Sequence, residues 1–308
     1  MQQPRFEEAC AACARGNLKL RATNSALARA FRDSSRIFYT MFALVLDANG
    51  PVTLAALQAL SAEFGLVSRG RAAALMMYLR IIGYLERRPE QASRRSVNLM
   101  ASPKLIAIHD KFVENELRAA AMLEPEAETA LARLTEPAFR RAHLRQTGIG
   151  LKRLIRLPGT PTSLFAERDA GLPILYQIAG SGDVYPAHEP VRVNLSETAR
   201  QHEVSRAHVT RLLRDAAAAG LMRQEPSGAW TLLEPLRDAL NRLHAFSFVA
   251  HCAVACGALR IVDEGGAPGG ERTEPSMSPV IGKAAAPVNA PVARGANLTT
   301  DNGAHPTR

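Results

Sequence analysis

The feature that most constrains the fold of this chain is an internal repeat. A Ser-Arg pair occurs twice, 137 residues apart, and a glycine follows each serine after the same 15 residues: Ser68-Arg69 with Gly83, and Ser205-Arg206 with Gly220. Each copy follows a shorter stretch of helical periodicity and precedes two short β-prone stretches around a turn. Because Ala and Leu matches occur easily by chance, this shared order is the stronger evidence. The chain is predicted to fold one small unit twice, in a first repeat (residues 51–100) and a second repeat (residues 191–232).

The spacing within each repeat predicts two helices joined by a tight turn. Such helices cross at a steep angle, so a small residue is expected at the crossing and an apolar residue in the turn: Ala62 with Val67, and Ala199 with Val204. The serine is a good N-cap, because its hydroxyl accepts a hydrogen bond from an otherwise unpaired backbone N–H. The glycine suits the left-handed conformation that ends many helices. Each repeat then continues into a predicted β-hairpin.

The two segments resemble the winged helix-turn-helix core of bacterial transcriptional regulators. In the second repeat the resemblance runs from Leu195-Ser196-Glu197 through Val204-Ser205-Arg206 to Gly220-Leu221. In the first repeat it runs from Val52 to Glu86 and is similar to MarR-type regulators. This resemblance implies that the second helix of each repeat enters the DNA major groove and that the hairpin contacts the DNA backbone or minor groove. It also implies a homodimer.

The two expected recognition helices offer different side chains. In the second repeat Val209, Leu212 and Leu213 are expected to face inward, which leaves polar residues for DNA: Arg206, His208, Thr210, Arg211 and Arg214, after the cap Ser205. In the first repeat the helix is almost wholly apolar after Arg71, and its expected inward positions are Ala72, Leu75, Met76 and Leu79. We therefore predict that base readout falls mainly to the second repeat.

The first repeat still carries basic residues at both ends of its expected DNA face. Its candidate DNA contacts are Ser68, Arg69 and Arg71 at the helix start, and Arg94 and Arg95 in an Arg-rich hairpin loop. Arginines in such a loop are expected to contact phosphates and to position the protein without selecting a sequence.

The charge of the chain favours a polyanionic partner. The formal net charge is +9, and Arg supplies most of the 38 basic residues. Arg suits bidentate contacts with phosphate and guanine, although GC-rich codon usage raises Arg and Ala together and accounts for the bias equally well. The most basic stretch, residues 137–156, has six Lys or Arg and no acid. It is expected either to grip phosphates or to be the solvated face of an amphipathic helix.

The pattern along the chain predicts a mainly α fold, in which two winged helix-turn-helix domains have small β-hairpin wings and flanking long helices. The expected segments are a polar lead-in (1–24), a first domain (25–122), an acidic-then-basic helical connector (123–160), a second domain with a C-terminal helix (161–262) and a disordered tail (263–308). The tail is rich in Gly and Pro and cannot bury enough apolar surface to offset its ordering entropy. Apolar helices at 25–46 and 235–259 are expected either to form a dimer interface or to pack on their own domain.

Other functional classes find little support in the sequence. No phosphate-binding Gly-rich loop, HExxH or GxSxG motif occurs, so we expect no catalytic activity, no cofactor and no metal. The cysteine pairs Cys10/Cys13 and Cys252/Cys256 lack zinc spacing, and buried or bystander thiols are expected rather than metal ligands. No leader peptide is visible, and the apolar window 245–262 contains His251 and Arg260. A buried helix, no membrane partner and a cytoplasmic location are the expectations.

Two alternatives to a transcriptional regulator stay open at this stage. A replication initiator of the plasmid type also carries tandem winged helices and would bind repeated origin sites. A protein-interaction module is the other alternative, because the poorly polar helix of the first repeat suits a protein partner better than DNA. The expected partner is double-stranded DNA, and a small-molecule effector is left open, since no residue cluster in the sequence marks its site.

Overall fold

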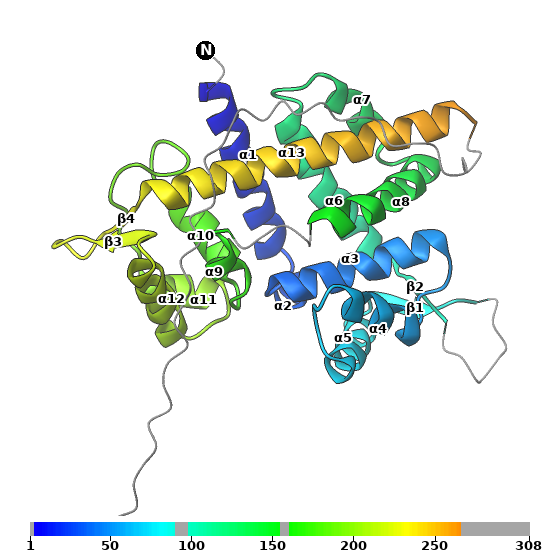
Figure 1. The fold of residues 1–308 in the computed structure, drawn as a ribbon, viewed down its shortest axis with the longest axis horizontal. Coiled ribbons are helices and arrows are strands. Elements are labelled where there is room, and N and C mark those ends of the chain that lie inside the picture. The colour runs from blue at the N-terminus through cyan, green and yellow to red at the C-terminus, as the bar shows by residue number, and fades with distance from the viewer. Residues whose placement is uncertain (1–2, 90–97, 155–159, 266–308) are drawn as a thin grey trace, which may run out of the picture. The chain divides into compact units, whose positions relative to one another are not determined.

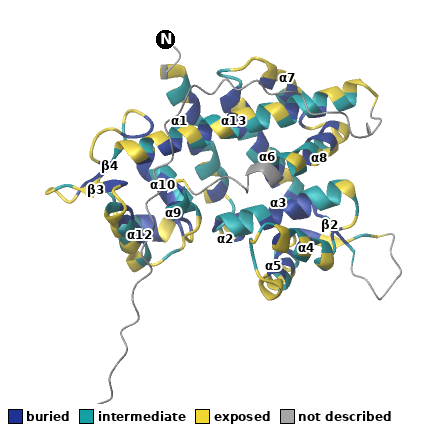
Figure 2. Ribbon diagram, viewed as in Figure 1, coloured by how far each residue is buried: buried dark blue, intermediate teal, exposed yellow. Residues whose placement is uncertain are grey.

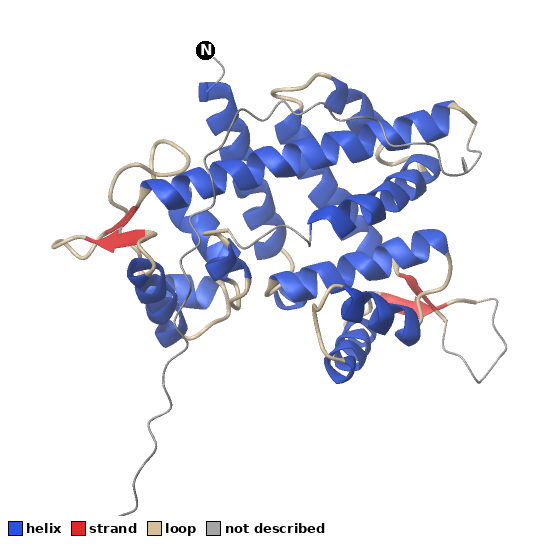
Figure 3. Cartoon of the chain, in the orientation of Figure 1, coloured by secondary structure: helices blue, strands red, loops and turns tan. Residues whose placement is uncertain are grey.

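The computed structural model of the chain describes residues 3–89, 98–154 and 160–265 (Figure 1). Within these ranges it contains thirteen helices and two small antiparallel β-hairpins (Figure 3). The prediction of a mainly α fold is confirmed. The expected tail from residue 266 onward and the loop holding Arg94 and Arg95 lie outside the described residues.

Long helices form the centre of the described chain, and all of them belong to one compact unit. They are α1 (Gln3–Ala22), α3 (Ser34–Asn49), α6 (Pro103–Ala120), α8 (Pro137–Leu154) and α13 (Glu234–Asp263). α13 packs on α6 and α8, α1 packs on α6, and α3 packs on α8 (Figure 1). Shorter helices complete this centre: α2 (Ser25–Ala30), α7 (Glu126–Arg133), α9 (Ser163–Ala166) and α10 (Gly171–Ala179).

The first repeat folds as the sequence predicts, helix, turn, helix and hairpin. Its elements are α4 (Leu54–Glu63), α5 (Arg69–Ile81), β1 (Leu85–Arg87) and β2 (Leu99–Ala101). The Ser68 hydroxyl caps α5 by accepting from the backbone N–H of Arg71 at 3.3 Å. Gly83 has a φ of +73°, in the left-handed region that favours glycine. β1 and β2 pair with Glu86 opposite Met100.

The second repeat contains the same elements in the same order. They are α11 (Leu195–Gln201), α12 (Arg206–Ala218), β3 (Met222–Gln224) and β4 (Trp230–Leu232). The Ser205 hydroxyl accepts from the backbone N–H of His208 at 3.0 Å, and Gly220 has a φ of +68°. In each repeat one residue before the first helix also pairs with the last strand, Val52 with Leu99 and Val191 with Trp230. The internal repeat is therefore a repeat of structure.

The turn between the two helices of each repeat shows that the sequence alignment of the repeats is wrong by one residue before this turn. The backbone N–H of Leu66 donates to the carbonyl of Ser61, as that of Val204 donates to the carbonyl of Ala199. Ser61 is buried and Ala62 is exposed, so Ser61 and not Ala62 is the counterpart of Ala199. The first turn has one residue more than the second, and an alignment anchored on the two serines could not show this.

The N-terminal segment is a core helix, which corrects the expectation of a polar lead-in. α1 buries Ala9, Cys10, Cys13 and Ala14 against α6 and α10. These small residues allow close approach between α1 and its neighbours. The buried residues form two clusters, and α6 and α8 contribute to both. Figure 2 colours each residue by its burial. The described helices α7 and α8 thus contribute to the core and are not a connector alone.

α13 is partly buried, where a buried helix was expected. Among the described residues it is the one helix long and apolar enough to cross a membrane by length and composition. Only 17% of its most apolar window is buried. One side packs on α6, α7 and α8, while Phe246 and Val249 are exposed. Like α3, it packs on helices of its own chain.

Candidate nucleic-acid interface

The outer face of α12 gathers the polar residues that the sequence predicts for DNA contact. Val209, Leu212 and Leu213 are buried, as expected from the helical period. The exposed side holds the three arginines Arg206, Arg211 and Arg214. In the described part of the chain, none of them takes part in an ion pair or a side-chain hydrogen bond. Their guanidinium groups are therefore available to an outside acceptor.

Thr210 and His208 make contacts within the protein. The Thr210 hydroxyl donates to the carbonyl of Arg206 at 3.0 Å, so its oxygen retains accepting capacity. His208 Nε2 lies 2.8 Å from the carbonyl oxygen of Asp169, a contact in which the imidazole donates. On the same helix Asp215 forms an ion pair with Arg168 at 3.1 Å. These two contacts hold α12 against the segment before α10, and His208 is a positioning residue in this geometry.

The outer face of α5 is apolar beyond its first turn. Ala72, Met76 and Leu79 are buried as expected, and Leu75 is partly buried. The exposed positions after Arg71 are Ala74, Met77 and Ile81, the last with 75% of its surface exposed. With the two serines in register, Ala74 occupies the position of Arg211 and Met77 that of Arg214. The first repeat lacks side chains that could hydrogen-bond base edges at these positions.

The basic residues at the start of α5 are in part already paired. Ser68 and Arg69 are exposed at the N-terminus of the helix, where backbone N–H groups favour an anion. Arg71 is half-exposed and lies 3.4 Å from the carboxylate of Asp33. In the hairpin Arg88 is held by Asp47 and by the carbonyl of Gly50, whereas Arg87 is exposed. Arg94 and Arg95 lie outside the described residues.

The basic stretch 137–156 is mostly α8, a helix of the core. Phe139, His143 and Leu144 are buried. Arg140 forms a two-oxygen contact with the Asp110 carboxylate at 2.9–3.0 Å, and Arg145 donates to the carbonyl of Ala48. Two of its arginines thus hold α8 to α6 and to the end of α3. Among the described basic side chains of this stretch, only Arg141 is left for an outside partner, and Lys152, Arg153 and Arg156 lie outside the described side chains.

The short segment Arg32-Asp33, between α2 and α3, contacts both repeats. Arg32 donates to the carbonyl of Glu203 in the turn of the second repeat, at 2.6 Å. Its neighbour Asp33 caps α3 and pairs with Arg71 of the first repeat. The sequence contained no signal for these contacts, because their partners lie 38 and 171 residues further along the chain.

The four cysteines form no disulfide bond with one another in this structure. Cys10 and Cys13 are buried as expected, while Cys252 and Cys256 are partly buried. Burial, reinforced by Glu7 and Glu116, raises the pKa of Cys10 to about 12. Within the described residues, no group of three His, Cys, Asp or Glu side chains is arranged to hold a metal ion.

Comparisons of the chain with protein-family models, with curated proteins and with solved structures give no match.

Proposed function

We propose that this protein binds double-stranded DNA in a sequence-dependent way and acts as a transcriptional regulator. Each repeat has the element order of a winged helix-turn-helix unit, with α5 and α12 in the position of recognition helices and the hairpins in the position of wings. In this proposal α12 enters the major groove and selects the sequence. The first repeat adds backbone contacts through Ser68 and Arg69.

The observation that carries this proposal is the outer face of α12. Three arginines, which have no partner among the residues that the structure describes, project from a helix whose opposite side is fully packed. Arginine is the residue best suited to bidentate contact with guanine O6 and N7, and its side chain is long enough to reach a groove floor. A solvated helix face would serve equally well with Lys or Glu, and neither occurs at an exposed position of α12.

Selection of bound duplexes from a random pool by the full chain tests this function. One enriched sequence is expected. Its affinity should fall steeply and linearly on a log–log plot against salt concentration, because each phosphate contact releases counterions. A pool that yields no preferred sequence, together with an affinity indifferent to salt, would overturn the proposal.

A second role is favoured for the first repeat by the apolar surface of α5. Ala74, Met77 and Ile81 lie one or two turns apart and are exposed together. Contiguous apolar patches on a soluble domain commonly mark contacts with other proteins. We propose that this face of α5 contacts another protein chain, while α12 contacts DNA.

A further inference from the structure

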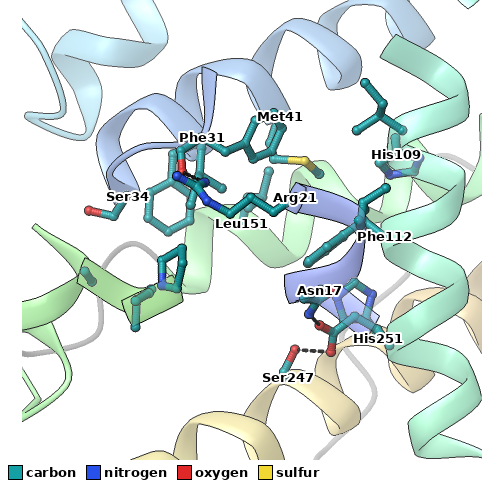
Figure 4. Close-up of a pocket in the computed structure, with 18 of the residues that line it drawn as sticks. Asn17, Arg21, Phe31, Ser34, Met41, His109, Phe112, Leu151, Ser247 and His251 are labelled. Atoms are coloured by element: carbon teal, nitrogen blue, oxygen red, sulfur yellow. Dashed lines mark hydrogen bonds between the residues drawn. The ribbon is translucent and has the colours of Figure 1, made fainter. Parts of the chain in front are cut away.

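A cavity of about 320 Å³ lies among the central helices of the chain (Figure 4). Residues of α1, α3, α6, α8, α10 and α13 line it, and most of its wall is apolar, including Phe31, Met41, Phe112 and Leu151. Its size falls at the lower end of the roughly 300–1,000 Å³ range of small-molecule sites. At the roughly 30 Å³ that a water molecule occupies in the liquid, the cavity has room for about ten non-hydrogen atoms.

The charged side chains of the wall stand in two separate places. Four Arg, Asp or Glu residues line the cavity: Arg21, Arg32, Asp33 and Glu116. The first three belong together, because Arg21 donates to the carbonyl of Phe31, which directly precedes Arg32 and Asp33. Glu116 is bonded instead to Ser247, and Figure 4 shows Ser247 on a different side of the cavity from Arg21. The cavity therefore has an arginine end and a glutamate end.

Arg21 is a buried cation that has no carboxylate partner among the described residues. It is 9% exposed, and it donates from Nη1 to the carbonyl of Phe31 at 2.8 Å and from Nη2 to that of Ala28 at 2.7 Å. Its Nε–H has no partner in the described part of the chain and is not one of the unpartnered atoms that the fold covers completely. Burial and the charge of Arg32 lower the pKa of Arg21 to about 10, with Glu203 opposing the shift. At pH 7 Arg21 therefore stays charged at a buried position, which is costly without a counter-charge.

Arg32 adds a second guanidinium group at the same end. It is half-buried, and its Nη2 donates to the backbone carbonyl of Glu203 at 2.6 Å. The Glu203 carboxylate pairs with Arg29 at 3.2 Å rather than with Arg32. A guanidinium has five N–H donors, so Arg32 retains several that no described residue accepts. Two cations with spare donors thus lie at one end of a mainly apolar cavity.

The acids around this end do not cancel its positive charge. Asp33 accepts from the backbone N–H of Arg36 at 2.9 Å and pairs with the guanidinium groups of Arg36 at 3.3 Å and Arg71 at 3.4 Å. The groups that contact one another here carry five positive charges and two negative charges, a balance of +3: Arg21, Arg29, Arg32, Arg36 and Arg71 against Asp33 and Glu203. Asp169, exposed beside the residue whose N–H donates to the Arg32 carbonyl, lowers this balance to +2. The arginine end therefore favours an anion.

The glutamate end favours no second anion, and its own charge is already satisfied. Glu116 accepts from Asn17 Nδ2 at 2.9 Å, Ser247 Oγ at 2.8 Å and Cys13 Sγ at 3.2 Å. Burial alone would raise the pKa of Glu116, but His251 and these three hydrogen bonds hold it below its usual range. Burial lowers the pKa of His251, so this histidine is uncharged at pH 7. An anionic group has only the arginine end as a favourable position among the described residues of the wall.

We propose that this cavity binds an amphipathic carboxylate, whose charged group is held by Arg32 and Arg21 and whose apolar body lies along Phe31, Met41 and Leu151. The planar guanidinium fork matches a carboxylate, and such charge-assisted hydrogen bonds are roughly twice as strong as neutral ones. An uncharged molecule would fill the apolar part and leave the arginines without a counter-charge, and a cation would be repelled by them. This proposal concerns binding alone and does not depend on the proposed function in DNA binding.

Three probes with the same eight-carbon chain test the proposal on the full chain at pH 7: octanoate, 1-octanol and octylamine. Titration by calorimetry should show octanoate binding roughly tenfold more tightly than 1-octanol, the worth of one hydrogen bond between charged groups. Octylamine, a cation at this pH, should bind most weakly. Arg32→Gln should weaken octanoate roughly tenfold and leave 1-octanol unchanged. Arg242→Gln, the same change at an exposed arginine of α13 outside the wall, is the matched control and should leave all three affinities unchanged.

A variant of the apolar wall shows whether the probes bind in the cavity or on the basic surface. Ala250 lines the cavity, and Ala250→Phe should weaken octanoate and 1-octanol alike by filling it while both arginines stay in place. The comparison of the three probes on the wild-type chain needs no variant, so it stays decisive if Arg32→Gln does not fold. Equal affinity for octanoate and 1-octanol, or tightest binding of octylamine, would overturn the proposal. So would an affinity for octanoate that neither Arg32→Gln nor Ala250→Phe reduces.

Discussion

The two repeats share a scaffold and differ in surface, and the comparison separates what folding requires from what function requires. Both have a serine N-cap, a left-handed glycine and buried residues at equivalent positions of the second helix. At the exposed positions, Arg211 and Arg214 of α12 correspond to Ala74 and Met77 of α5. Exposed positions contribute little to stability, so they are free to diverge. The divergence gives each repeat its own proposed role.

The largest expected effect tests whether the two scaffolds are equally important for stability. Met76 and Leu213 are equivalent inward positions, one nearly and one fully buried. Met76→Ala and Leu213→Ala should each lower the free energy of unfolding by about 2–5 kcal/mol, because each leaves a cavity. Urea denaturation followed by circular dichroism measures both. A loss below about 1 kcal/mol at one position alone would show that this repeat is loosely packed.

Lowering the pH should destabilise the second repeat more than the first. His202 caps the end of α11 and lies 2.6 Å from Gln177 Oε1, where Phe64 stands in the first repeat. Burial, aided by Arg21, lowers the pKa of His202 to about 4. In the unfolded chain His202 is protonated near pH 6.5, so the stability that comes from its lowered pKa is fully present above that pH. It is lost as the pH falls towards 4, by up to about 3 kcal/mol.

His202→Phe copies the residue of the first repeat and checks this acid effect. Thermal unfolding of the variant should depend less on pH between 6.5 and 4 than that of the wild-type chain. His244 also has its pKa lowered to about 4 by burial, so part of the pH dependence should remain. An unchanged pH dependence would contradict the assignment to His202.

The two caps should contribute alike. Ser68→Ala and Ser205→Ala each remove one hydrogen bond to a helix N-terminus and should each cost about 1 kcal/mol. Chemical denaturation of the two single variants and the double variant measures them, and the effects should add because the caps share no partner. Strong non-additivity would indicate that the two repeats unfold as a coupled pair.

The smallest effect on stability is expected at the apolar face of α5. Ile81→Glu should change the free energy of unfolding by no more than about 0.5 kcal/mol, because the side chain is exposed. It should reduce self-association or partner capture if this face serves assembly. Ala218→Glu at the equivalent exposed position of α12 is the matched control. Equal association of both variants and the wild-type chain would remove the proposed role of this face.

The elements of both repeats could be predicted from the sequence because their determinants are local. A serine cap, a glycine 15 residues later and the helical period of Val209, Leu212 and Leu213 each act over one helix. The turn register at Ser61 could not be predicted, since a backbone hydrogen bond and not a side chain defines it. The contact of His208 with Asp169 and the packing of α1 depend on residues distant in sequence.

The cavity lined by His109, Glu116 and His251 could also not be predicted from local sequence patterns. His109, His143 and Glu116 lie on two helices, and His251 on a third, so only the packing of α6, α8 and α13 brings them together. The pair His109-Asp110 stands in the sequence without a neighbouring motif. That neither ring nitrogen of His109 has a hydrogen bond to a described residue, while Arg140 engages Asp110, is visible only in the folded structure.

The most direct test of the asymmetry is to give α12 the residues of α5. For the DNA sequence selected by the wild-type chain, fluorescence anisotropy compares the affinity for that sequence with the affinity for a scrambled one. The double variant Arg211→Ala/Arg214→Met should lose most of this ratio, by about 1–3 kcal/mol for each arginine that reaches a base. Arg69→Ala should weaken both duplexes alike. A ratio that survives the double variant, or that Arg69→Ala abolishes instead, would contradict the assignment of sequence readout to the second repeat.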